Sequence, residues 1–104
     1  TNGSVIGVRE ENREFRVDNA YPNPFNSSVS IDYQIPEGAN VNLVVYDTNG
    51  REVRRLYLGH RNGGSYNVKW DGRDSKGRSV GNGVYLFQLK AGEFSKTGKL
   101  MLVK

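Results

Sequence analysis

The segment from residue 29 to residue 35 limits the fold of this chain more than any other. Every second residue from Val29 to Ile35 is apolar, and the residues between them are polar. A period of two places alternate side chains on opposite faces of a β-strand, whereas an amphipathic helix needs a period near 3.6. We therefore predict a half-buried strand, closed by the proline and glycine at positions 36 and 38.

Most of the remaining chain shows similar short runs, and no part of it has the pattern of an amphipathic helix. Residues 41–46 are apolar on both faces, which is typical of a strand in the middle of a sheet. Residues 51–58 carry alternating charges, which is typical of a protected edge strand. The expected strands are 15–17, 29–35, 41–46, 51–58, 65–70, 83–90 and 93–104. About seven short strands, with turn signals every ~8 to 12 residues, predict an all-β, antiparallel sandwich.

The last two runs form the clearest hairpin. Residues 83–90 and 93–104 are rich in apolar residues, and a turn of Ala91 and Gly92 separates them. A two-residue turn that contains glycine favours a tight hairpin. Because chain ends are usually polar and frayed, we expect this apolar end to be buried in the sheet, recognised by a partner, or both.

A proline-rich segment precedes the predicted strand 29–35. Pro22 and Pro24 fix their own φ angles and push the residues before them into extended conformations, which excludes a helix. We expect a rigid, irregular crossover here. Tyr21 and Phe25, on either side of the prolines, are expected to fill the end of the core.

The polar loop after residues 65–70 contains a pair of carboxylates whose spacing could suit catalysis or metal binding. Trp70 is expected in the core, and Asp71, Gly72 and Asp74 follow it. Such a pair could serve in acid–base catalysis or bind calcium, but basic residues lie among the acids and further oxygen ligands are missing. Asp side chains accept hydrogen bonds from nearby backbone N–H groups, so we expect both to hold the turn.

No other residues suggest an enzyme. The chain has no cysteine, and its only histidine, His60, lies in the glycine-rich stretch 59–64, which is expected to be a surface loop. A catalytic triad or a zinc site would need further partners at informative spacings. We predict no catalytic residue, no metal site and no cofactor.

Length and charge further limit the class of protein to which this chain can belong. With 104 residues the chain is long enough for one domain. Residues 1–13 are interpreted as a linker or a cloning remnant, and residues 14–104 as the folded domain. The net charge of +4 is spread over turns and strands, so no nucleic-acid partner is expected. No apolar run approaches the ~20 residues of a membrane-spanning helix.

Six motifs occur in order along the chain. They are 19–26 (NAYPNPFN), 31–36 (IDYQIP), 45–53 (VYDTNGREV), 70–77 (WDGRDSKG), 83–85 (GVY) and 99–104 (KLMLVK). This set resembles the type A C-terminal sorting domain of the type IX secretion system. That family is similar to the immunoglobulin-like domain of flagellar hook-capping proteins, with which it shares the Trp-Asp-Gly loop. The resemblance runs from Phe15 to the last residue.

The resemblance implies an immunoglobulin-like sandwich with a role in secretion. Such domains sit at the C-terminus of secreted enzymes and adhesins of Bacteroidetes and related phyla, and direct an already folded cargo across the outer membrane. The implied partners are the upstream cargo in the same polypeptide, an outer-membrane shuttle protein and a sortase that attaches the cargo to surface lipopolysaccharide. The protein would pass through the periplasm and be secreted or attached to the outer cell surface.

Carried over by position, the sorting signal lies in the terminal hairpin, and residues 21–25 mark the entrance of the domain. The sequence departs from many family members at Ser27, where proline is common, and at Gly98, where a lysine or another polar residue is frequent. The signal positions that the resemblance implies are Gly83, Val84, Tyr85, Gly92, Lys96, Lys99, Val103 and Lys104.

The physics of strands suggests how such a signal is read. A last strand whose outer edge is free could add to a β-structure of a partner. Gly98 could supply a bulge or hinge that lets the end peel away. Deletion of residues 100–104 is then expected to abolish export and leave most of the fold. Leu100 and Leu102 would point to one face of this strand, and Met101 and Val103 to the other. One of these two pairs should pack on the domain. The other pair, together with Lys99 and Lys104, would then face the partner.

Two other functions stay open. An accessory module that binds carbohydrate or another surface polymer would need exposed aromatic side chains, and Tyr46 and Tyr57 are the candidates because their strand positions are expected to face outward. A structural spacer, like the hook-capping domain, would need only the sandwich.

Overall fold

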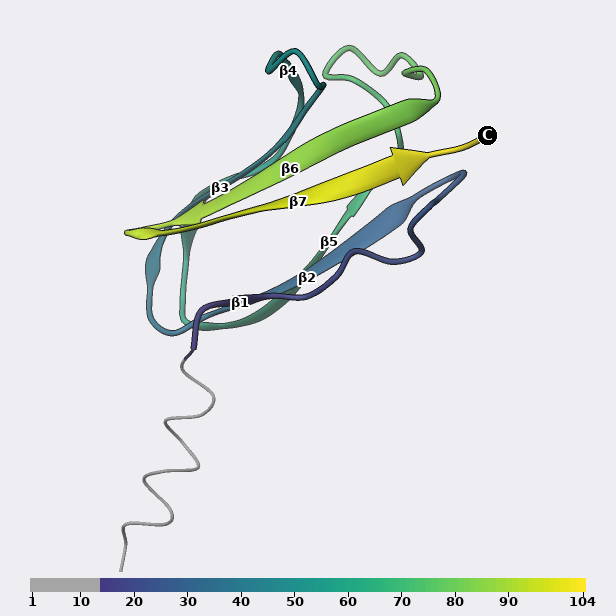
Figure 1. Ribbon diagram of the computed structural model, residues 1–104. Coiled ribbons are helices and arrows are strands. Elements are labelled where there is room, and N and C mark those ends of the chain that lie inside the picture. The colour runs from purple at the N-terminus through teal and green to yellow at the C-terminus, as the bar shows by residue number, and fades with distance from the viewer. Residues whose placement is uncertain (1–13) are drawn as a thin grey trace, which may run out of the picture.

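The computed structural model describes residues 14–104, so the expected linker of residues 1–13 lies outside the described residues. The described part is all-β, without a helix, and forms an antiparallel sandwich of two sheets, as predicted (Figure 1). Its strands are β1 (Arg16–Val17), β2 (Val29–Ile35), β3 (Ala39–Tyr46), β4 (Glu52–Arg61), β5 (Gly64–Trp70), β6 (Gly83–Ala91) and β7 (Phe94–Leu102).

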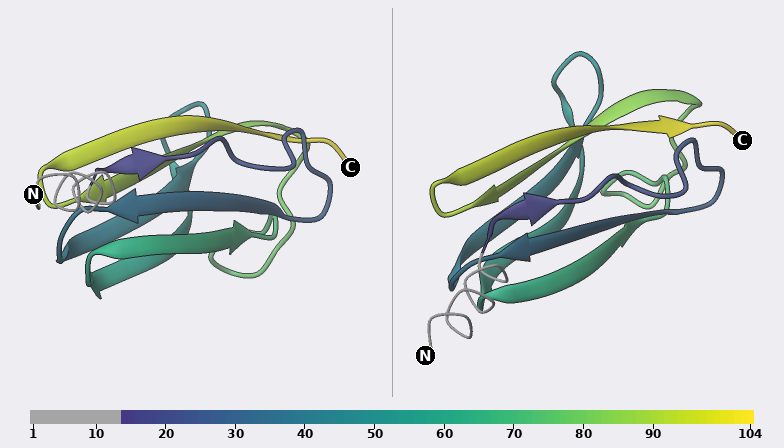
Figure 2. Two further views of the ribbon diagram at one scale, coloured as in Figure 1. Left: turned by 90° about the horizontal axis from the view of Figure 1, so that it is seen from below. Right: turned by 60° about the horizontal axis from the view of Figure 1, so that its bottom comes forward.

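The strands divide into a three-stranded and a four-stranded sheet. The smaller sheet has the order β1-β2-β5 and the larger the order β4-β3-β6-β7. The apolar strand β3 is therefore internal and the charged strand β4 is at an edge, as their sequences predict. The other edge of the larger sheet is β7, which passes close to β1 of the opposite sheet in both views of Figure 2.

The core lies between the two sheets. Trp70 is fully buried, and its ring packs between those of Phe25, at 5.6 Å, and Tyr85, at 5.3 Å between centroids. Its indole N–H donates to the carbonyl oxygen of Arg73 at 2.9 Å. Trp70 and Phe25 thus fill the core as predicted.

Tyr21 does not fill the core and is 50% exposed. Its backbone N–H and carbonyl bond to Ser30 in an isolated antiparallel bridge. Residues directly opposite each other in such a pair project from the same face, so the tyrosine lies on the outer face of the smaller sheet. There its hydroxyl donates to Asp32 at 2.9 Å.

Two expected boundaries are also wrong. The stretch 59–64 is mostly strand rather than loop, because β3 begins at Ala39 and pairs with Arg61, which extends β4 through His60. The turn of the last hairpin is Gly92-Glu93, because Ala91 pairs with Phe94. Gly92 has a φ of 60° at the first turn position, a conformation that glycine adopts at no steric cost.

The loop after Trp70 is held by its own carboxylates, as predicted. Asp71 accepts a hydrogen bond from the backbone N–H of Arg73, and Asp74 accepts from those of Lys76 and Arg78 at 2.9 and 3.0 Å. The bond from Arg78 is the main reason that the pKa of Asp74 is lowered. Gly72 has a φ of 73° and is buried.

Candidate partner-binding site at the edge of strand β7

Strand β7 places alternate side chains on the two faces of its sheet. Leu100 and Leu102 point into the core and are 0% and 1% exposed, whereas Val103 is 50% exposed. Met101 lies on the outer face and is half-buried. The alternation expected for these four residues is therefore present, with the leucine pair packed on the domain.

The outer edge of β7 is not free along its C-terminal half, contrary to our expectation. Asn23 donates through Nδ2 to the carbonyl oxygen of Lys99 and accepts through Oδ1 from the N–H of Met101, both at 2.9 Å. The N–H of Phe25 donates to the carbonyl of Met101, and the N–H of Val103 donates to that of Phe25. The proline-rich crossover thus covers the edge from Lys99 to Val103.

Gly98 is not a bulge or hinge. The register between β6 and β7 runs without interruption, and Gly98 lies directly opposite Phe87. A Cβ at position 98 would overlap the ring of Phe87, which is itself buried. The glycine is needed because it makes room for an aromatic ring of the core.

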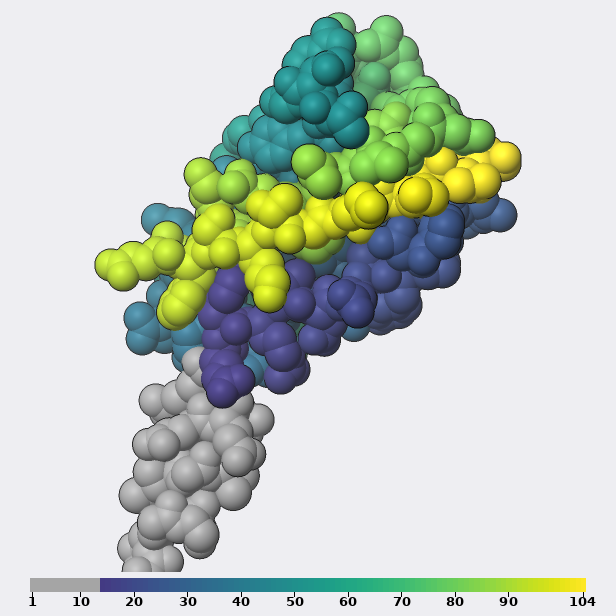
Figure 3. All heavy atoms as spheres, viewed as in Figure 1, coloured from purple at the N-terminus to yellow at the C-terminus, as the bar shows by residue number. Residues whose placement is uncertain are grey.

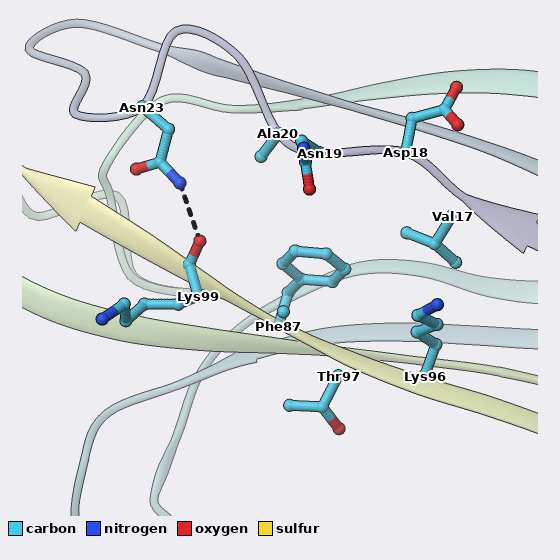
Figure 4. A pocket seen from close by; sticks show the side chains of 10 residues that line it. Val17, Asp18, Asn19, Ala20, Asn23, Phe87, Lys96, Thr97 and Lys99 are labelled. Carbon is cyan, nitrogen blue, oxygen red and sulfur yellow. Dashed lines mark hydrogen bonds between the residues drawn. The ribbon is translucent and has the colours of Figure 1, made fainter.

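Between β1 and β7 lies a pocket of about 300 Å³ (Figure 4). Phe87 and Val17 supply its apolar part, and the side chain of Lys96 points from β7 toward β1 while that of Thr97 points away. Asn23 closes one end through its bond to Lys99. The pocket is lined by residues 17–20 and 96–99, together with Asn23 and Phe87.

The charge at this edge is positive. Lys96 and Lys99 are exposed, and no ion pair formed within residues 14–104 includes either of them. Asp18 also lines the pocket, but its carboxylate pairs with Arg16 at 3.2 Å. Two lysines are thus available to an acidic partner.

Lys104 is held against the domain rather than free. Its ammonium donates to the carbonyl oxygen of Val80 at 3.0 Å, and its backbone N–H donates to Asn82 at 3.1 Å. The exposed Val103 beside it lines a shallow depression with Pro22 and Pro24. Val103 therefore bonds to the crossover, whereas Lys104 is tied to the loop before β6.

The remaining predicted signal residues lie in two groups. Gly83, Val84 and Tyr85 pair with Leu102, Met101 and Leu100, so the structure brings these segments together. Tyr85 is buried, burial raises its pKa, and its hydroxyl donates to the carbonyl of Gly81 at 2.7 Å. Gly92 lies in the turn at the opposite end of the hairpin.

The candidates for other kinds of site are occupied by intramolecular contacts. The guanidinium of Arg61 lies 3.8 Å from the ring centroid of Tyr57 and 4.4 Å from that of Tyr66. One face of Tyr57 is therefore covered rather than open to a sugar ring, and Tyr46 is half-buried. Of the predicted acidic pair, Asp71 forms an ion pair with Arg54 at 3.6 Å.

Within residues 14–104, no three histidine, cysteine or acidic side chains are grouped so that they could hold a metal ion. The same part of the chain contains no helix that is long and apolar enough to span a membrane.

Sequence reasoning missed the two features that shape this site. The bonds of Asn23 join residues 76 and 78 positions apart, and no local pattern signals a contact of that range. The space that the Phe87 ring occupies beside Gly98 depends on the pairing of β6 with β7. Here a signal existed, because glycine inside a strand often marks the close approach of another group.

Comparison with known proteins extends these observations. No sequence among the curated proteins matches the chain. Among solved structures, FlgD from P. aeruginosa is 33% identical over 71% of this chain and 58% of its own, with a TM-score of 0.56. PorZ of Porphyromonas gingivalis, described as an essential surface component of the type IX secretion system, is 26% identical over 86% of this chain, with a TM-score of 0.55.

PorU from Porphyromonas gingivalis shares the fold, with a TM-score of 0.68 and 24% identity over 86% of this chain. The chain spans only 9% of PorU and 11% of PorZ. A protein-family profile described as the FlgD Ig-like domain matches residues 23–94, which is most of the chain. The chain therefore belongs to the FlgD Ig-like domain family, and its sandwich is immunoglobulin-like.

Proposed function

We propose that this chain is a non-catalytic sorting domain that directs a folded upstream cargo across the outer membrane through the type IX secretion system. The observation that carries the proposal is the similarity to PorZ, which is 26% identical over 86% of this chain and is described as a surface component of that system. The ordered motifs of residues 19–104 support it. The product would be secreted or attached to the outer cell surface.

In this proposal the partner reads the terminal hairpin of β6 and β7. Buried residues of the expected signal, such as Tyr85 and Leu100, act by keeping the hairpin folded. The exposed side chains of Lys96 and Lys99 are the ones that a shuttle or sortase component could contact directly. The signal is then a folded surface rather than a linear tail.

A structural role, as a spacer or cap, is the second candidate. It is favoured by the match to the FlgD Ig-like domain family and by the 33% identity to FlgD from P. aeruginosa. This role would need the sandwich but no particular chemistry at the β7 edge. The two candidates therefore differ in whether a domain of the same fold could replace this one.

The test is a domain exchange. A folded periplasmic reporter is joined to residues 1–104, or to the Ig-like domain of FlgD, and expressed in a bacterium that has the type IX system. We expect the first fusion outside the cell and the second in the periplasm, because only the first carries the proposed signal. Equal localisation of the two fusions would contradict a sorting role and favour a spacer.

A further inference from the structure

The edge of β7 is open over one short stretch. Backbone groups of Lys99, Met101 and Val103 point away from β6, since they bond to the crossover of residues 23–25. In an antiparallel ladder this direction repeats at every second residue, so the N–H and C=O groups of Ser95 and Thr97 also point outward. Within residues 14–104, no backbone group bonds to them on that side.

The opposite wall of the pocket is also an open strand edge. β1 pairs through one edge with β2, at Arg16 and Val17, and turns its other edge toward β7. Figure 3 shows β7 running along the surface directly above the residues of β1. Two unpaired edges facing one slot are a template for an extended chain.

Both ends of this slot are closed. At one end the rings of Phe15 and Phe94 stack at 4.9 Å between centroids and 11° between planes. At the other end Asn23 bonds to Lys99 and Met101. The open window therefore runs from Ser95 to the N–H group of Lys99, whose carbonyl oxygen already bonds to Asn23. It is long enough for a short segment of a partner and too short for a long strand.

The side chains of the window specify what fits. A strand added beside β7 would place one residue next to Gly98, where no side chain of β7 fills the pocket and where Phe87 and Val17 are apolar. A residue of the size of valine matches that position. On one side of it lies Lys96, toward β1, and on the other lies Lys99, each without an ion-pair partner within residues 14–104.

We propose that the window from Ser95 to Lys99 binds an extended acidic segment of a partner protein by β-strand addition. Bonds to the backbone N–H and C=O groups of Ser95 and Thr97 and to the N–H of Lys99 would supply affinity, and the lysines and the pocket would supply specificity. In the bound segment, the residues opposite Lys96 and Lys99 are acidic and lie three positions apart. The small apolar residue opposite Gly98 lies between them. The inference rests on the proposed function for the identity of the partner, but the binding itself can be measured without secretion.

Lysines on an edge strand can instead prevent pairing, and the experiment separates the two roles. The full chain, labelled with ¹⁵N, is titrated with two capped peptides, Thr-Glu-Val-Thr-Glu-Thr for antiparallel and Thr-Glu-Thr-Val-Glu-Thr for parallel addition. We expect one of them to shift the amide signals of Ser95, Thr97 and Lys99 saturably and to slow their hydrogen exchange. Peptides with lysine in place of glutamate should bind about tenfold more weakly or not at all.

Charge reversal provides the matched variants. Lys96→Glu with Lys99→Glu should reverse the preference, so that the lysine peptide binds better than the glutamate peptide. Lys69→Glu with Lys76→Glu changes the net charge equally at exposed positions outside the hairpin of β6 and β7 and should leave the preference unchanged. Absence of saturable shifts at millimolar peptide, shifts centred on β4, or an unchanged preference in the first variant would overturn the proposal, whatever the outcome of the domain exchange.

Discussion

At position 98, β7 has no side chain, and the ring of Phe87 from β6 occupies the space that a Cβ would need. Gly98→Ala should lower the free energy of unfolding by about 1–3 kcal/mol, the usual cost of overpacking a core. Urea unfolding measures the loss. Gly81→Ala is the matched control, since nothing lies within 4 Å of a Cβ there, and it should change stability little. Equal effects of the two substitutions would show that the packing at Gly98 is unimportant.

The loop carboxylate Asp74 has a lowered pKa, chiefly because the N–H of Arg78 donates to its charged form. A depressed pKa in the folded state contributes stability above the pKa of the unfolded chain, about 3.9 for Asp, and that contribution is lost as the pH falls through the folded value. Asp74→Asn should therefore be less stable than the parent at pH 7. Denaturant unfolding across acidic pH should show the difference shrinking below about pH 4, and a constant difference would contradict this cause.

The environments of some individual residues can be predicted from sequence, and those of others cannot. Trp70 and Asp74 follow rules that act locally: a large apolar side chain in an alternating run is buried, and a loop aspartate bonds to the backbone a few residues away. The environments of Tyr21 and Gly98 instead depend on which residue of a paired strand lies opposite them, Ser30 and Phe87 respectively. Their environments could not be read from neighbouring residues.

At the scale of elements, the proline-rich crossover is joined to the last strand by the side chain of Asn23. Asn23→Ala removes two exposed hydrogen bonds, to Lys99 and Met101, which should cost about 1 kcal/mol in total stability. Hydrogen exchange measured by NMR should become faster at Met101 and Val103. Asn26→Ala is the control, because within residues 14–104 the Asn26 side chain has no hydrogen-bond partner. Exchange that stays unchanged in Asn23→Ala would show that the two bonds of Asn23 do not hold the crossover to β7.

All seven strands were predicted from short-range pattern and turn residues, since a period of two is a property of the strand itself. Their ends were less accurate. β4 continues through His60 because β3 offers partners as far as Ala39, and the coverage of the β7 edge depends on where the crossover of residues 21–25 comes to lie. Both depend on the arrangement of elements, which the pattern of one strand does not contain.

At the scale of the whole molecule, the last five residues supply two leucines of the core. Deletion of residues 100–104 would remove Leu100 and Leu102, both fully buried, and losing a buried leucine side chain costs about 2–5 kcal/mol. Since small domains are stable by about 5–15 kcal/mol, we expect this deletion to unfold most of the protein, contrary to the sequence-based expectation. Deletion of residues 103–104 should leave the thermal transition nearly unchanged. Circular dichroism with heating distinguishes the two, and a folded 1–99 fragment would contradict the prediction.

We propose that export by the type IX system depends on the open edge of β7. The measurement that tests this is the fraction of a folded reporter found outside the cell when the fused chain carries Lys96→Glu with Lys99→Glu. The charge-matched control carries Lys69→Glu with Lys76→Glu, and both variants are first shown to unfold at the same temperature as the parent. We expect the first variant to keep the reporter in the periplasm while the control exports it like the parent. Export of both variants to the same extent would contradict this proposal.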